Sequence, residues 1–262
     1  MIVFKKDFFQ SFFMKNTFIV FMYLTVFTFA CQNERPTIVY SIGDSTMANK
    51  TKEVYPETGW CQVIGDYFDE TVFVRNHAKN GRSSKSFLSE GLWQNVLDSL
   101  RQGDYVFIQF GHNDQKKHDS IRYTLPFDTF PENLERYVNE SRSKGAVPVL
   151  FTSIVRRKFG DDCKLIDTHG DYLEATKNVA RQLNVPLIDL NELTEEWINS
   201  LGEESSKEMF LWTKPNEEFP NGRQDNTHLS VKGANCVARM AVEELKKLDL
   251  DISGKIKLED KD

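Results

Sequence analysis

The sequence predicts an α/β protein built on a five-stranded parallel sheet with helices on both faces. Short apolar runs rich in β-branched and aromatic residues alternate along the chain with helical patterns. Several of these runs are apolar on both faces, as is typical of central strands covered on two sides. The 262 residues, 40% of them hydrophobic and 27% charged, suffice for one large domain with a core and do not demand two.

The predicted elements alternate in order along the chain. The expected strands cover residues 37–42, 71–78, 104–110, 146–155 and 185–190. The clearest helical patterns cover residues 132–145, 171–184 and 232–248, and Gly145 is a typical C-terminal stop. We therefore place one α/β domain at residues 37–250 and expect residues 251–262 to form a frayed, charged tail.

The first 30 residues have the pattern of a secretory signal. Three lysines precede an uncharged run at 17–30, which is short for a membrane-spanning helix; an uncleaved N-terminal anchor is the alternative. The Ala30–Cys31 break resembles a bacterial lipoprotein site, although Phe29 and Thr28 are atypical there. Simple cleavage and lipidation of Cys31, which would anchor the protein to a membrane, both stay open. We expect an exported protein of the bacterial periplasm, outer membrane or cell surface, with residues 31–36 as a linker.

The net charge and the cysteine content limit further which class of protein this sequence can encode. The formal net charge is −6, and removing residues 1–30, which hold three Lys and one Asp, makes it −8. An acidic protein is a poor candidate for nucleic-acid binding, and neither a zinc-type Cys/His spacing nor a P-loop is present. If Cys31 is lipidated, three cysteines remain: Cys61, Cys163 and Cys236. Export permits a disulfide between two of them, but buried unpaired thiols are equally consistent with the sequence.

Four polar segments follow predicted strands or precede the last helix. They are "GDST" at 43–46, "NG" at 80–81, "GHND" at 111–114 and "DNTH" at 225–228. Each alone is ordinary, because Asp, Ser and Asn-Gly are common in caps and turns. In open α/β sheets, however, the carboxyl ends of the strands share one rim, where ligands bind. Together these segments bring to that rim a hydroxyl, a base, an acid and amide donors, which is what nucleophilic acyl transfer requires.

The chemistry assigns a role to each of five residues. Ser45 is the predicted nucleophile, and its amide is a predicted oxyanion donor. His228 is the predicted general base, because Asp225 lies three residues before it and can orient its ring. Gly81 allows close backbone approach, so its amide can point at an oxyanion, and Asn113 can donate a further bond from its side chain.

These four segments resemble the blocks of the GDSL-type esterases, the SGNH hydrolase superfamily. The letters of that name fall on Ser45, Gly81, Asn113 and His228. The resemblance implies a flavodoxin-like three-layer α/β/α fold, a Ser–His–Asp triad and an oxyanion hole. "GDSTM", "GHNDQK", "TSIVRRKF" and "DNTHLSVKGA" are similar to the rhamnogalacturonan acetylesterase branch. That likeness implies removal of acetyl groups from a pectic polysaccharide without a metal or organic cofactor.

Cations concentrate in the same loops and are candidates for holding an acidic polysaccharide. They are Arg82, Lys85, Lys116, Lys117, His118, Arg156, Arg157, Lys158 and Arg223. We select Arg156 and Arg157 as candidate substrate contacts, together with His112 beside Asn113; solvated loop charges are the alternative. We expect His118 and His169 to be exposed, and Trp60 to belong to the core rather than to a sugar platform.

Three other functions remain open: a deacetylase of another glycan such as xylan, a lipase or thioesterase on the same scaffold, and an inactive glycan-binding protein. The polar rim loops favour a short acyl group over a lipid tail. The acetylated sugar, the ester position, the chain length and the oligomeric state are not determined by the sequence.

Overall fold

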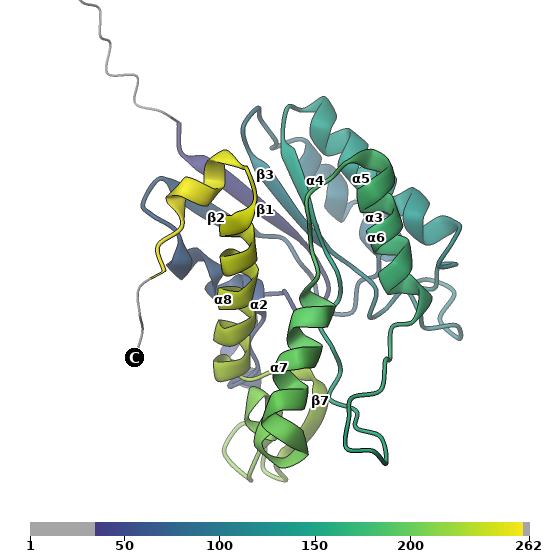
Figure 1. Ribbon diagram of the computed structural model, residues 1–262, viewed down its shortest axis with the longest axis vertical. Coiled ribbons are helices and arrows are strands. Elements are labelled where there is room, and N and C mark those ends of the chain that lie inside the picture. Colours follow the sequence, from purple (N-terminus) through teal and green to yellow (C-terminus); the bar gives the residue numbers. More distant parts are fainter. Residues whose placement is uncertain (1–34, 259–262) are drawn as a thin grey trace, which may run out of the picture. The chain divides into compact units, whose positions relative to one another are not determined.

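The strand β1 (Thr37–Gly43) is an inner strand of the sheet and is buried on both faces. The computed structural model describes residues 35–258 and is shown in Figure 1. Val39 faces one hydrophobic cluster, whereas Ile38, Tyr40 and Ile42 face the other. An almost uninterrupted apolar run therefore gives a strand with two dry faces.

Five parallel strands form the sheet in the order β2-β1-β3-β4-β5. Their bounds are β2 Val72–Asn76, β3 Tyr105–Gln109, β4 Val147–Phe151 and β5 Leu187–Ile188. The predicted strands are confirmed, although four of them are shorter than the apolar runs that predicted them. The last strand keeps two of six expected residues, because Asp189 caps the helix that follows.

Helices cover both faces of the sheet, which confirms the three-layer α/β/α architecture (Figure 1). One face is covered by α2 (Trp60–Val63), α7 (Leu190–Ser205) and α8 (Val231–Lys247). The other is covered by α3 (Ser84–Ser89), α4 (Leu92–Leu97), α5 (Thr129–Ser143) and α6 (Asp171–Leu183). The three predicted helices are α5, α6 and α8.

A small antiparallel hairpin, not predicted from the sequence, carries two of the predicted catalytic residues. It pairs β6 (Phe210–Thr213) with β7 (Arg223–Leu229). Residues 225–228 were expected in a loop, so that expectation is wrong. The segment has no apolar alternation because only Leu229 is buried, and its extended form depends on pairing with β6.

The C-terminal segment packs against the domain as far as it is described. A 3₁₀ helix at Asp251–Lys255 buries Ile252, and Ile256 forms a β-bridge with Phe68. The expected frayed tail is therefore wrong for residues 251–258. Besides the two buried isoleucines, backbone hydrogen bonds from Lys257 to Tyr67 and from Asp69 to Lys255 hold the segment, although its composition is mostly polar.

The signal, lipidation and linker expectations for residues 1–34 lie outside the described residues. Within residues 35–258, no helix is both long enough and apolar enough to cross a membrane. Cys61, Cys163 and Cys236 are not disulfide-bonded; Cys61 is buried and Cys163 is exposed.

Candidate active site

A chain of buried hydrogen bonds fixes the loop that carries Ser45. Asp44 Oδ1 accepts from the backbone amide and the hydroxyl of Thr46, both at 2.8 Å. Gln109 Nε2 donates to Thr46 Oγ1 at 2.6 Å, and Gln109 Oε1 accepts from Trp60 Nε1 at 3.1 Å. Trp60 is fully buried, which confirms its place in the core. These bonds leave the Ser45 side chain half-buried at the rim of the sheet.

Ser45 lies in a turn and not at the start of a helix, although Asp and Ser are common in helix caps. The amides of Met47 and Ala48 donate to the Asp44 carbonyl, and no helix continues from there. Gly43 allows this tight turn, because a Cβ there would lie 2.6 Å from the Gln109 carbonyl oxygen. The sharp exit from β1 presents the serine hydroxyl outside the sheet.

Ser45, His228 and Asp225 form a hydrogen-bonded row across 183 positions of sequence. His228 Nε2 lies 2.9 Å from Ser45 Oγ, and His228 Nδ1 lies 2.8 Å from Asp225 Oδ2. Asp225 Oδ1 also accepts from the backbone amides of Thr227 and His228. The acid therefore orients the ring on one side and leaves the other nitrogen for the serine, the arrangement that a general base requires.

The environment of Asp225 keeps it ionised. Burial by itself would raise its pKa, but the hydrogen bonds from the His228 side chain and backbone and from Thr227 outweigh burial. The pKa of Asp225 is consequently held well below its usual range. An ionised carboxylate at Nδ1 stabilises the imidazolium that forms when His228 takes a proton.

The predicted oxyanion donors lie beside Ser45. Gly81 and Asn113 both line the same pocket, and Gly81 has a φ of +75°, which favours glycine. Asn113 Nδ2 donates one hydrogen to the Arg82 carbonyl at 2.9 Å, which orients the amide and leaves its second hydrogen available. The donation from Ser45, Gly81 and Asn113 to an oxyanion stays a prediction.

Two buried charges that the sequence did not single out hold these loops together. Asp114 accepts from the amide and hydroxyl of Ser84, the amide of Gly111 and the hydroxyl of Thr124. Burial raises the pKa of Asp114 to about 7, and those donors oppose the rise. Asp114 thus ties the start of α3 to the segment that carries Asn113.

The second buried charge is Lys50. Its ammonium pairs with Glu57 and donates to Asn80 Oδ1, both at 2.7 Å, and its side chain is 1% exposed. Lys50 therefore fixes the residue that precedes Gly81. No pattern in the sequence shows that the side chains of Lys50 and Asp114 are buried, because most of their partners lie 7 to 30 positions away.

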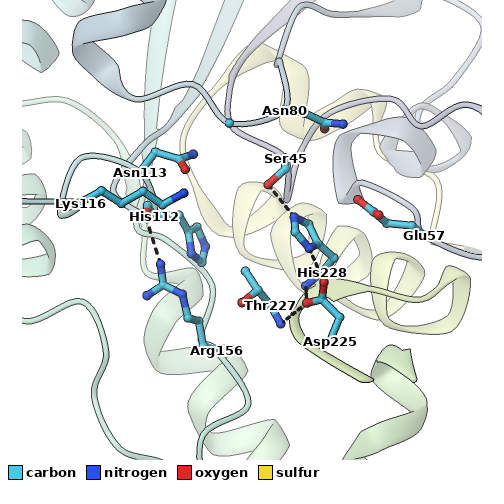
Figure 2. Close-up of a pocket in the computed structure, with 11 residues that line it drawn as sticks. Ser45, Glu57, Asn80, His112, Asn113, Lys116, Arg156, Asp225, Thr227 and His228 are labelled. Atoms are coloured by element: carbon cyan, nitrogen blue, oxygen red, sulfur yellow. Dashed lines mark hydrogen bonds and ion pairs between the residues drawn. The ribbon is translucent and has the colours of Figure 1, made fainter. Parts of the chain in front are cut away.

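The pocket has a volume of about 430 Å³ and two unlike walls (Figure 2). Ser45, His228 and Asp225 form one wall, and His112, Lys116 and Arg156 form the opposite one. We call the second the cationic wall. Among residues 35–258, no three His, Cys, Asp or Glu side chains gather closely enough to hold a metal ion.

His112, in the cationic wall, forms a buried pair with His169, which does not line the pocket. His169 Nε2 lies 3.2 Å from His112 Nδ1, and each residue is 3% exposed. The expectation that His169 is exposed is therefore wrong, because the segment before α6 buries this side chain. His118 is exposed, as expected. Burial and then the charge of Arg156 lower the pKa of His169 to about 3. Burial also holds the pKa of His112 well below its ordinary value, helped by His169 and Arg156.

The two candidate arginines differ in position. Arg156 lines the pocket, but its guanidinium donates to the carbonyls of Thr168 and His112. Arg157 does not line the pocket and is 3% exposed. It donates to Ser206 Oγ, to Asn226 Oδ1 at 3.1 Å and to the Glu203 carbonyl. Its selection as a substrate contact is thus not supported: it holds the strand that carries Asp225 and His228.

Fold and site together define a serine hydrolase of the α/β/α class. The sequence matches the GDSL-like Lipase/Acylhydrolase family over residues 41–235, and the chain belongs to that family. It is therefore a carboxylic ester hydrolase.

Individual relatives give a more specific similarity than the family does. The chain is 43% identical to the rhamnogalacturonan acetylesterase RhgT of Bacillus subtilis, over 84% of this chain and 94% of that protein. It is 36% identical to the probable rhamnogalacturonan acetylesterase YesY of the same organism, over 83% of this chain and 96% of that protein. The crystal structure of the protein YxiM, also from Bacillus subtilis, superposes with a TM-score of 0.68 at 28% identity, over 81% of this chain and 56% of that one.

Proposed function

We propose that this protein is an exported esterase that removes O-acetyl groups from an acidic, rhamnogalacturonan-like pectic polysaccharide. The observation that carries the proposal is the triad at 2.9 and 2.8 Å facing a cationic wall across one polar pocket. Similarity to two proteins named as rhamnogalacturonan acetylesterases, one of them only as probable, supports the choice of substrate.

The mechanism follows from the triad. Ser45 Oγ attacks the acetyl carbonyl carbon while His228 Nε2 takes the serine proton, and the carbonyl oxygen becomes an oxyanion facing the amides of Ser45 and Gly81 and the side chain of Asn113. His228 then returns the proton to the departing sugar oxygen as the C–O bond breaks. A water molecule, activated in turn by His228, hydrolyses the acetyl–serine ester and releases acetate.

The pocket lining favours a short acyl group. The lining residues are Ser45, Glu57, Asn80, Gly81, His112, Asn113, Lys116, Arg156, Asp225, Thr227 and His228. None is a large apolar side chain, so an extended acyl chain would lie against charges and amides. The lipase or thioesterase alternative is disfavoured for that reason, whereas xylan remains an alternative acetylated substrate.

The test compares substrates on wild type and Ser45→Ala. We expect acetate release from acetylated rhamnogalacturonan to exceed release from acetylated xylan, and hydrolysis of 4-nitrophenyl acetate to exceed that of the long-chain palmitate ester. Ser45→Ala should lose all of these activities. Preference for xylan or for the long-chain ester would contradict the proposed substrate, and full activity in Ser45→Ala would contradict the mechanism.

Export and anchoring form a separate part of the proposal. We propose cleavage of the N-terminal segment, with Cys31 as the lipid acceptor if the site is of lipoprotein type. Mass spectrometry of the mature N-terminus in a bacterial host distinguishes the two cases. A lipid mass lost in Cys31→Ser supports anchoring, and an unmodified, cleaved N-terminus contradicts it.

A further inference from the structure

The cationic wall contains a buried ring nitrogen with no partner. His112 lines the pocket, and among residues 35–258 its Nε2 atom makes no hydrogen bond although it is shielded from solvent. Its other nitrogen, Nδ1, is occupied by His169. Leaving a buried polar atom unpaired is unfavourable, so such an atom in a binding pocket indicates that a ligand supplies the partner.

The hydrogen-bond chain behind His112 favours one position for its proton. A guanidinium can only donate, and Arg156 Nη1 lies 3.3 Å from Thr168 Oγ1, which must accept. Within residues 35–258 the other hydrogen-bond contact of that hydroxyl is His169 Nδ1 at 3.4 Å, and we assign the hydroxyl hydrogen to it. With Nδ1 as acceptor, His169 is protonated on Nε2 and donates to His112 Nδ1 at 3.2 Å. His112 is left with its proton on Nε2, which makes that atom a donor at the pocket surface.

Both imidazoles stay neutral at ordinary pH. Burial lowers the pKa of each of them, and the charge of Arg156 lowers both further. The donor at His112 Nε2 is therefore constant across the neutral range, unlike that of an exposed histidine.

Lys116 adds a charge to the same wall. It lines the pocket, is exposed, and within residues 35–258 its ammonium has neither a hydrogen-bond nor an ion-pair partner in the protein. Burial and the neighbouring charges of Arg122 and Arg156 lower the pKa of Lys116, and Lys116 in turn lowers that of His112. The effect of these cations on the pKa of Lys116 exceeds the opposing effect of Asp119 and Asp44, so an anion placed beside Lys116 and His112 would be stabilised.

We propose that His112 and Lys116 form a subsite for the carboxylate of a uronate unit in the substrate, across the pocket from Ser45. His112 donates its Nε2 hydrogen and Lys116 its ammonium. His169 is a positioning residue, because it acts through the tautomer of His112, and Arg156 supports the chain from behind. The subsite deepens the proposed function and rests on it.

The first experiment measures inhibition of 4-nitrophenyl acetate hydrolysis by galacturonate and by its neutral counterpart galactose. We expect galacturonate to compete at least about 10-fold more strongly than galactose, because hydrogen bonds to a charged group are stronger than those between neutral groups. Lys116→Gln should raise the galacturonate inhibition constant about 10-fold. The matched control, Lys117→Gln, removes the adjacent exposed charge, which does not line the pocket, and should leave that constant unchanged.

The second experiment tests the positioning residue. His169→Leu removes the donor to His112 Nδ1, whereas His169→Gln keeps an N–H at a similar position. We expect galacturonate to inhibit His169→Leu more weakly than wild type, and the inhibition to recover in His169→Gln. The comparison requires that both variants have the same kcat for the small ester. A merely structural role would lower kcat in both and leave the galacturonate-to-galactose ratio unchanged.

The outcomes separate the subsite from the proposed function. Equal inhibition by galacturonate and galactose, no inhibition by either, or equal effects of Lys116→Gln and Lys117→Gln would each overturn the subsite. Small-ester hydrolysis that does not depend on Ser45 would instead overturn the proposed function.

Discussion

His228 and His112 line the same pocket from opposite walls, and their partners give them different chemistry (Figure 2). The Nδ1 atom of His228 faces the carboxylate of Asp225, which orients the ring and leaves Nε2 for the Ser45 hydroxyl. The Nδ1 atom of His112 faces another imidazole backed by Arg156, and burial with these neighbours holds the pKa of His112 well below its ordinary value. One ring is therefore suited to take and return a proton, and the other to remain a neutral donor. The residue behind a histidine, more than its place on a loop, decides which of these it does.

Removal of the base or the nucleophile tests the first half of this comparison and should have the largest effect. His228→Ala and Ser45→Ala should each lower kcat by at least about 10³-fold, and the double variant should be little worse, because the two residues act as a unit. Steady-state kinetics on 4-nitrophenyl acetate measure this. Additive losses in the double variant would contradict the triad, and His118→Ala, an exposed histidine outside the pocket, is the control.

Asp225→Asn should make His228 resemble His112 by removing its anionic partner. We expect kcat to fall by about 10²–10⁴-fold, because the amide neither fixes the required tautomer nor stabilises the imidazolium. The melting temperature should be recorded in parallel, since Asp225 also accepts two backbone amides. A folded variant with nearly full kcat would remove Asp225 from the mechanism.

Asn113 lies beside the cationic wall, but its predicted role is to donate to the oxyanion that forms when Ser45 attacks. Asn113→Ala should lower kcat by about 10²–10³-fold with a small change in KM, because an oxyanion donor acts mainly in the transition state. A loss confined to KM would instead place Asn113 among the substrate contacts, beside Lys116.

The His112–His169 pair should make the protein sensitive to acid. The pKa of His169 in the folded state, about 3, lies below its ordinary 6.5. The unfolded chain consequently binds more protons between those values, and the free energy of unfolding falls as the pH drops from about 6.5 towards about 3. Chemical denaturation across this range should show a loss of up to a few kcal/mol that His169→Gln reduces. Identical pH profiles for the two proteins would contradict the assignment.

The smallest expected effect is that of salt, which should weaken the contribution of the cationic wall more than that of the wall formed by the triad. Raising the ionic strength from about 0.05 to about 0.5 M screens exposed charges such as Lys116, so KM for acetylated acidic pectin should rise several-fold. Hydrolysis of a neutral acetyl ester, which depends on the triad wall, should change less. Equal salt sensitivity of both substrates would argue against any electrostatic contribution of the cationic wall.

The strands and the triad were accessible from the sequence because their signals are local. Runs of apolar residues predicted all five strands of the sheet, and the rule that parallel strands end at one rim brought Ser45, Gly81, Asn113 and His228 together. The hairpin that carries His228 was missed, because an exposed polar strand has no periodic apolar pattern. The docked C-terminal segment was missed for the same reason, since only two of its side chains within residues 251–258, Ile252 and Ile256, are buried.

By itself, then, the sequence determined the layers of the fold and the residue types at the catalytic rim. Only the tertiary structure decided which polar groups remain available to a substrate. Arg156 and Arg157 read alike in the sequence, yet their guanidinium groups take partners 12 to 69 positions away, whereas Lys116 takes none within residues 35–258. The physical reason is that a long polar side chain finds its hydrogen bonds through the folded chain, and no local pattern in the sequence records which partners the fold will bring within 3 Å.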